Sequence, residues 1–256
     1  MAPRGIDTHA HLFLSDFAQD IEAVTHRAKG ACLAVLLPNL DLHTLPAVIQ
    51  LMQREPDFYF GMIGLHPTHV KADFHEQLQG LEAQLHSYPW VAIGEVGIDL
   101  YHDRSTYELQ REALDLQAKR AAQLHLPLSI HFREALDQTL ETLRPYEVKG
   151  VFHCFTGSYE EAKKILDAGF YVGIGGVITY KNATALHEAV RKIPLEQIVL
   201  ETDSPYLAPV PMRGKRNESS YLPYIARAVA ELKGISVGNV IEKTTLNAQT
   251  LFRLPV

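Results

Sequence analysis

The chain has 256 residues, of which 46% are hydrophobic and 21% charged, the usual balance of a globular protein. Its net charge of −6 argues against a protein that binds nucleic acid through bulk electrostatics. No apolar run approaches the roughly 20 residues that span a membrane, and no signal peptide is apparent. Two cysteines are too few for a disulfide framework. We therefore expect a cytoplasmic, monomeric protein without membrane association, folded as one domain over 1–256.

Short apolar runs alternate with longer amphipathic stretches along the whole chain, which predicts alternating strands and helices. Strands are predicted at 5–12, 31–38, 58–65, 91–98, 128–132, 148–155, 170–178 and 198–202. Helices are predicted at 16–29, 42–54, 74–87, 107–125, 136–143, 158–168, 183–192, 221–233 and 236–251. Gly30 is expected to end the first helix, and Ser158 with Glu161 forms the capping-box pattern that begins a later one.

Eight strands that alternate with helices indicate a parallel sheet, and eight is the number that closes a (β/α)8 TIM-type barrel. The alternative is a doubly wound open sheet, which usually has fewer strands around a switch point. Ligand-type residues favour the barrel, because they recur at the carboxyl ends of five predicted strands. In a closed barrel these ends converge on one mouth, whereas in an open sheet they would be spread along an edge.

The first predicted strand carries two histidines, His9 and His11, in the stretch Gly5–Leu12. Side chains alternate faces along a strand, so both imidazoles point the same way, with Asp7 on that face as well. Two imidazoles side by side are suited to a divalent metal such as Zn or Mn. Alone the motif is weak, since two neighbouring histidines among 13 can be coincidence.

Six residues at predicted strand ends share this chemistry, and together they predict a metal centre. They are His9, His11, Glu95, His131, His153 and Asp203. Each is a plausible isolated polar residue, but six on inward faces are costly to bury unless they bind metal. Four imidazoles and two carboxylates fit two divalent ions better than one. Glu95, on the middle strand, is placed to bridge the two ions.

Seven motifs in order give the chain a specific resemblance to a known family. They are Asp-Thr-His-Ala-His-Leu at 7–12, Gly-Leu-His-Pro at 64–67, Gly-Glu-Val-Gly-Ile-Asp at 94–99, Ile-His-Phe-Arg at 130–133, His-Cys-Phe-Thr-Gly-Ser at 153–158, Glu-Thr-Asp-Ser-Pro-Tyr-Leu at 201–207 and Arg-Gly-Lys-Arg-Asn-Glu at 213–218. With them the chain resembles the TatD family of metal-dependent hydrolases, within the amidohydrolase-like barrels. One departure is Ser219-Ser220, where the family often has Pro-Ala.

The resemblance implies a deoxyribonuclease, often a magnesium-dependent 3′→5′ exonuclease that acts on DNA ends or single strands. By resemblance, one ion is held by His9, His11, Glu95 and Asp203, and the other by Glu95, His131 and His153. We expect two divalent cations (Mg, Mn or Zn) to make hydroxide available from a shared water near neutral pH. Asp203 is expected to take up the water's proton and pass it to the leaving oxygen, and Glu95 to bridge the ions.

Four further residues are predicted to contact substrate: Arg133, His66, Lys215 and Arg216. Arg133 follows His131 on the same strand face, and its guanidinium can make a two-pronged contact with a phosphate. The alternative is a salt bridge from Arg133 to a loop carboxylate. His66 ends the third predicted strand, where a structural histidine is nearly as plausible.

Lys215 and Arg216, with Arg213, lie in a loop that either follows a nucleic-acid backbone or is merely solvated. Glu201 faces the same way as Asp203 and is expected to support the site. Cys154 is expected to face the opposite side from His153, in the core.

Two other functions remain open. The first is a hydrolase of a small amide, lactone or phosphoester on the same scaffold, because fold does not fix function. Relatives of that kind often bridge their metals with a carbamylated lysine, and the predicted strands 91–98 and 128–132 contain no lysine. The second is a noncatalytic binder with a structural metal, which the open coordination of this residue set disfavours.

Overall fold

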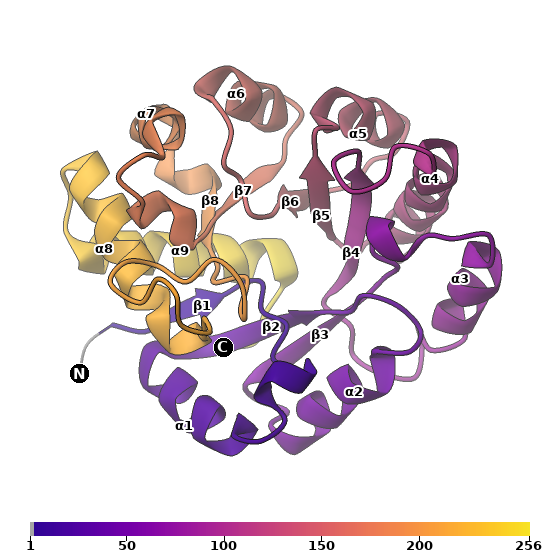
Figure 1. Ribbon diagram of the computed structural model, residues 1–256, viewed down its shortest axis with the longest axis horizontal. Coiled ribbons are helices and arrows are strands. Elements are labelled where there is room, and N and C mark those ends of the chain that lie inside the picture. The colour runs from indigo at the N-terminus through magenta and orange to yellow at the C-terminus, as the bar shows by residue number, and fades with distance from the viewer. Residues whose placement is uncertain (1–2) are drawn as a thin grey trace.

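Eight parallel strands form one sheet in the order β1 to β8, and the computed structural model describes residues 3–256. The strands are β1 Gly5–Asp7, β2 Cys32–Pro38, β3 Tyr59–Ile63, β4 Ala92–Asp99, β5 Leu128–Arg133, β6 Gly150–Phe152, β7 Tyr171–Ile174 and β8 Ile198–Leu200. The helices are α1 Ile21–Ala31, α2 Leu45–Arg54, α3 Phe74–Glu82, α4 Tyr107–Leu124, α5 Leu136–Leu143, α6 Tyr159–Asp167, α7 Thr184–Lys192, α8 Leu222–Lys233 and α9 Val237–Phe252. Figure 1 shows α1 to α8 arranged around the strands. The predicted (β/α)8 barrel is confirmed.

The strands are apolar on both faces because each face is buried against a different partner. In β2, Val35 and Leu37 belong to the large cluster that includes the surrounding helices. Ala34 and Leu36 belong to a second cluster, which takes alternate residues from several strands and reaches Phe252 of α9. The alternation gives the barrel a packed interior and a packed outer layer.

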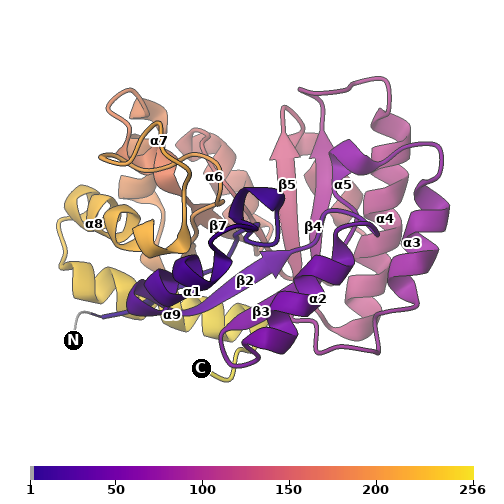
Figure 2. The same ribbon diagram turned by 60° about the horizontal axis from the view of Figure 1, so that its bottom comes forward.

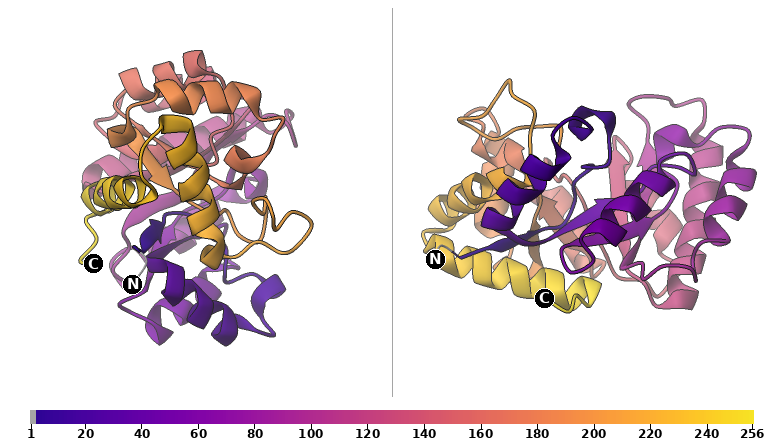
Figure 3. Two further views of the ribbon diagram at one scale, coloured as in Figure 1. Left: turned by 90° about the vertical axis from the view of Figure 1, so that its left-hand side faces the viewer. Right: turned by 90° about the horizontal axis from the view of Figure 1, so that it is seen from below.

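Helix α9 closes the amino end of the barrel. Asn247 on this helix donates hydrogen bonds to the carbonyls of Leu195 and Ile198, at 2.8 and 2.7 Å, just where β8 begins. Figure 2 shows α9 beneath the strands, with the arrowheads of β4 and β5 pointing away from it. Figure 3 shows the long loop after β8 at the end opposite α9. The carboxyl ends of the strands therefore open at the mouth that this loop borders.

The barrel closes between β8 and β1 through irregular backbone contacts. The Thr8 amide donates to the Leu200 carbonyl at 3.0 Å, and the Asp203 amide donates to the His9 carbonyl at 2.9 Å. The predicted strand 5–12 is therefore too long: β1 ends at Asp7, and the following residues pair with the loop after β8. This pairing brings the two histidines of the motif against Asp203.

Some helix boundaries follow the local capping rules, and others differ from the boundaries predicted from the sequence. The capping box of Ser158 and Glu161 is present at the start of α6. The prediction that Gly30 ends the first helix is wrong, since α1 continues to Ala31. The residues before α1 form a short 3-10 turn at Ser15–Phe17 instead of helix, which buries Phe17. Within residues 3–256 no helix is both long and apolar enough to cross a bilayer.

Gly97 allows β4 and β5 to approach closely behind the site, and Gly97→Ala is expected to destabilise the fold. Its φ is +149°, and an added Cβ would lie 1.8 Å from the His131 carbonyl oxygen. We expect the free energy of unfolding to fall by at least about 2 kcal/mol in urea titrations. Gly30→Ala, in α1 with nothing near its Cβ, is the control and is expected to be neutral or stabilising. Equal stability of the Gly97 variant and wild type would contradict the steric argument.

Candidate metal centre

A cavity of about 730 Å³ opens at the mouth of the barrel, where the strands end. Its lining includes four histidines and two carboxylates that contact one another: His11, His66, Glu95, His131, His153 and Asp203. His9 lies beneath them, with none of its surface exposed. All six predicted ligands therefore lie together, although their positions in the sequence span almost 200 residues. His66, predicted as a substrate contact, lies among them.

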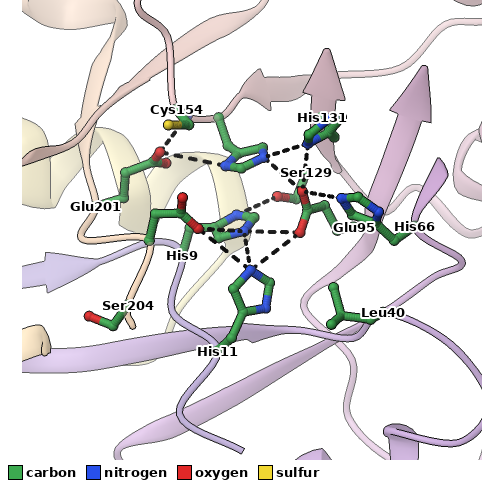
Figure 4. A network of polar contacts seen from close by, with 12 residues as sticks. His9, His11, Leu40, His66, Glu95, Ser129, His131, Cys154, Glu201 and Ser204 are labelled. Carbon is green, nitrogen blue, oxygen red and sulfur yellow. Dashed lines mark hydrogen bonds and ion pairs between the residues drawn. The ribbon is translucent and has the colours of Figure 1, made fainter. Parts of the chain in front are cut away.

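Glu95 is at the middle of the cluster, and its two carboxylate oxygens face different histidines (Figure 4). The contacts of Oε1 are His153 Nε2 at 2.7 Å, His131 Nδ1 at 3.1 Å and His66 Nε2 at 3.1 Å. The contacts of Oε2 are His9 Nε2 at 3.2 Å and His11 Nε2 at 3.5 Å. One carboxylate thus divides the imidazoles into two sets, one on each oxygen.

Asp203 belongs to the second of these sets. Its Oδ1 lies 3.6 Å from His11 Nε2 and 4.0 Å from His9 Nε2. The two Nε2 atoms are themselves only 3.2 Å apart. His9, His11 and Asp203 thus present three donor atoms to one small volume.

The residues present fit divalent cations. Three groups each place one ligand atom per residue within 4.8 Å of one another: His9, Glu95 and His153; His9, His11 and Asp203; His66, Glu95 and His131. Imidazole nitrogens that face each other at 3.2 Å repel unless a proton or a cation lies between them. His, Asp and Glu are also the donor types that Zn, Mn and related ions use. The cluster is therefore able to bind metal.

The electrostatics keep the two carboxylates ionised. Burial alone would raise the pKa of Glu95, but the imidazoles of His66, His153 and His9 lower it well below its usual value. Burial likewise opposes the charge of Asp203, yet its contact with His11 and the nearby imidazoles lower its pKa. Burial lowers the pKa of His9, which favours the neutral, metal-binding form of that ring. Both carboxylates are thus available as anionic ligands at neutral pH.

Two residues without an assigned role in the sequence analysis orient the imidazoles. Ser129 Oγ lies 3.2 Å from His9 Nδ1, which leaves His9 Nε2 facing Glu95. Asp99 Oδ2 lies 2.9 Å from His131 Nε2, which leaves Nδ1 of that ring facing Glu95. Carboxylate and hydroxyl partners of this kind fix the tautomer of a ligating histidine. Asp99 was detectable, because it follows Glu95 by four residues on the same strand face.

His66 is held as a hydrogen-bond donor. Its Nδ1 accepts a hydrogen bond from the Thr68 backbone amide at 3.2 Å, so in the neutral ring Nε2 carries the proton. Burial lowers the pKa of His66 to about 4, so the ring is neutral at pH 7. Its Nε2–H therefore points to Glu95 Oε1 and the cavity. This geometry suits a contact with substrate oxygen better than metal coordination.

The predicted cationic contacts are separated in the structure. Arg133 lines the mouth, with its guanidinium 3.8 Å from the centre of the Tyr101 ring. Lys215 and Arg216 instead border a second cavity, lined also by Arg27.

Arg216 makes two hydrogen bonds of 2.8 Å to the carboxylate of Asp20. Its guanidinium also lies 4.4 Å from the centre of the Phe17 ring. The donors of Arg216 are thus used within the chain, and the structure does not bring it to the mouth.

The expectation that Cys154 faces the core is wrong. Cys154 is half-buried and lines the mouth cavity. Strand β6 ends at Phe152, and Cys154 has a φ of 48°, so the alternation of strand faces does not extend to it. Its backbone amide donates to Glu201 Oε1, which also lies 3.7 Å from His153 Nδ1. Glu201 thus supports the segment that carries His153.

Asp99→Asn is expected to weaken metal binding by about 10- to 100-fold, because the negative charge behind His131 is lost. Calorimetric titration of the metal-free protein with Mn²⁺ or Zn²⁺ measures this without an activity assay. Asp103→Asn is the control, since Asp103 contacts Ser105 in a nearby loop and no cluster residue. Unchanged affinity in the Asp99 variant, with the fold intact by circular dichroism, would show that Asp99 does not orient a ligand.

A parallel eight-stranded barrel with a cluster of imidazoles and carboxylates at its mouth defines a metal-dependent hydrolase. The profile of the TatD related DNase family matches residues 6–253. The chain belongs to this TatD family of metal-dependent hydrolases, as the motifs indicated.

Relatives of known name agree with the family match. The chain is 37% identical over 252 residues to the uncharacterized metal-dependent hydrolase YabD of Bacillus subtilis, covering 97% of this chain and 98% of that one. It is 34% identical over 257 residues to the 3′-5′ ssDNA/RNA exonuclease TatD of Erwinia tasmaniensis, covering 97% and 99%. The crystal structure of YjjV, a TatD homologue from Escherichia coli, superposes with a TM-score of 0.93 at 29% identity, over 100% of both chains.

Proposed function

We propose that the protein is a phosphodiesterase that uses two divalent cations (Mg, Mn or Zn) to hydrolyse DNA, preferentially at ends or in single strands and in the 3′→5′ direction. The observation that carries the proposal is the division of the imidazoles between the two oxygens of Glu95. With histidines at each of its oxygens, Glu95 would hold a divalent cation on either side. His9, His11 and Asp203 would complete one ion's ligands, and His131 and His153 those of the other.

The side chains around the cluster have separate tasks in this proposal. Bound divalent cations would lower the pKa of an attacking water and offset charge on the phosphodiester. Asp203, which is ionised, accepts the water's proton and returns it to the leaving oxygen. The Nε2–H of His66 and the guanidinium of Arg133 donate to nonbridging phosphate oxygens. All these groups border one cavity.

Relatives and the lining of the mouth support DNA over a small amide or lactone. The Erwinia tasmaniensis relative is named as an ssDNA/RNA exonuclease, and the match covers almost its full length. The mouth lining within residues 3–256 includes Arg133 but no lysine able to act as a carbamylated bridge. An arginine beside the metal cluster suits an anionic substrate.

A substrate panel with controlled metal content tests the proposal. Protein stripped with a chelator is supplied with Mg²⁺, Mn²⁺ or Zn²⁺ and given labelled single-stranded DNA, duplex DNA, RNA, dipeptides and a lactone. We expect oligonucleotide cleavage that the chelator abolishes, and saturation at two ions per chain by elemental analysis. Hydrolysis of dipeptide or lactone alone would overturn the DNA substrate. Full activity at one ion would overturn the two-metal assignment.

We also propose that the protein acts as a cytoplasmic monomer. Cys32 and Cys154 are both free thiols, which is typical of proteins in a reducing compartment. The site is assembled from one chain, since each residue of the metal cluster comes from the same barrel. Light scattering at micromolar concentration tests the oligomeric state, and a dimer would contradict it.

A further inference from the structure

The exposed aromatic side chains of residues 3–256 both lie at the mouth of the barrel. They are Tyr101, 57% exposed, in the segment after β4, and Tyr206, 53% exposed, in the segment after β8. Strands 4 and 8 are on opposite sides of an eight-stranded barrel, so the two rings lie on opposite rims.

Tyr206 is held in a fixed position beside the metal cluster. Its amide donates to the Asp203 carbonyl at 2.9 Å, and its carbonyl accepts from Asn217 Nδ2 at 2.7 Å. Its ring centre lies 6.2 Å from that of His11, with the planes at 64°. Leu207, 40% exposed, continues the apolar rim, and both residues line the cavity. The segment thus presents an apolar surface beside the metal cluster, with its backbone anchored by hydrogen bonds.

We propose that Tyr206 stacks on the unpaired base of the nucleotide whose phosphodiester lies at the metal cluster. This inference rests on the proposed function and adds a specificity-determining residue to it. Aromatic side chains stack on any base, because every base has a π-face. A base inside a duplex already has stacked neighbours on both sides, so only a single-stranded or frayed end offers a free face. Tyr206 thereby selects unpaired ends without selecting sequence.

Tyr101 has a different task, because one of its faces is already covered. The Arg133 guanidinium lies 3.8 Å from its ring centre, the arrangement of a cation–π contact. Tyr101 therefore positions Arg133, which acts on the phosphate rather than on the base. The two tyrosines can therefore be compared directly. The contribution of Tyr206 requires a base on the substrate, whereas the contribution of Tyr101 does not.

The test crosses two substrates with the two tyrosines. One single-stranded oligonucleotide carries a normal terminal nucleotide, and the other carries a tetrahydrofuran abasic residue there with the same phosphodiester. With Tyr206→Leu we expect KM for the normal strand to rise about 10- to 100-fold, the range of one lost base stack, and KM for the abasic strand to stay unchanged. Tyr206→Phe should retain wild-type KM on both. Tyr101→Leu should impair cleavage of both strands by the same factor.

Each outcome decides between the alternatives. Equal losses for Tyr206→Leu on both strands would overturn the stacking role and indicate an effect on the metal cluster. Equal KM values for wild type on both strands would overturn the stacking role but leave the nuclease function intact. Wild type that neither cleaves nor binds either strand, measured by fluorescence polarisation with Mg²⁺ present, would overturn the proposed function and the stacking role together.

Discussion

Asp203→Asn is expected to slow turnover on an oligonucleotide by at least about 10²-fold, the usual scale for a lost acid–base group. The asparagine keeps the size of the side chain but cannot accept a proton. The barrel should remain folded, because the backbone contact that closes it, from the Asp203 amide to His9, does not involve the side chain. Single-turnover kinetics with saturating metal measures the chemical step alone.

Metal occupancy must be measured in the same samples, because Asp203 is also a proposed ligand, 3.6 Å from His11 Nε2. We expect the loss of rate to persist at metal concentrations that fill the site. Asp167→Asn is the control, since Asp167 is exposed at the end of α6 and pairs with Lys163. Wild-type turnover in the Asp203 variant would remove this residue from the mechanism.

The parts of the fold that the sequence predicted are those that local rules determine. Alternating apolar runs predicted all eight strands and their order, because buried parallel strands need apolar residues on both faces. The capping box at Ser158 was equally readable, since its contacts lie within one helical turn. The length of β1 could not be predicted from the sequence. It depends on hydrogen bonds between Thr8 and Leu200, which are 192 residues apart.

In the candidate site, too, some residues could be predicted from the local sequence and others depend on the fold. His9 and His11 could be proposed as ligands because they are close in sequence and point to one side. The orientation of Cys154 was missed, since it depends on a left-handed backbone angle beyond the end of β6. Arg133 and Arg216 were both predicted to contact substrate, Arg133 from its strand face and Arg216 from a loop whose role was left open. Only the fold reveals that Asp20, 196 positions away, occupies the donors of Arg216.

Arg133→Ala is expected to lower kcat/KM on an oligonucleotide. The corresponding loss of transition-state stabilisation is about 2–4 kcal/mol, the scale of one lost transition-state donor. A phosphodiester gains charge in the transition state, so a positioned guanidinium stabilises it more than the ground state. The structure favours this role over the alternative of a salt bridge. The neighbouring carboxylate of Glu134 pairs with Arg104 at 2.7 Å, and within residues 3–256 the guanidinium of Arg133 lies over the Tyr101 ring instead of forming an ion pair. Its donors are thus available to a substrate in the cavity.

Three comparisons distinguish a phosphate contact from a structural one. Arg133→Lys should recover only part of the lost rate, because a single ammonium cannot make a two-pronged contact with phosphate. Arg144→Ala, an exposed arginine that follows α5, is the control and should cleave as wild type does. Metal occupancy should be unchanged in all three variants, since arginine is not a ligand. If Arg133→Ala cleaves DNA at the wild-type rate with its metal bound, the guanidinium holds no phosphate. The hydrolase of a small neutral amide or lactone then becomes the better account of this barrel, because such a substrate needs no cation at the mouth.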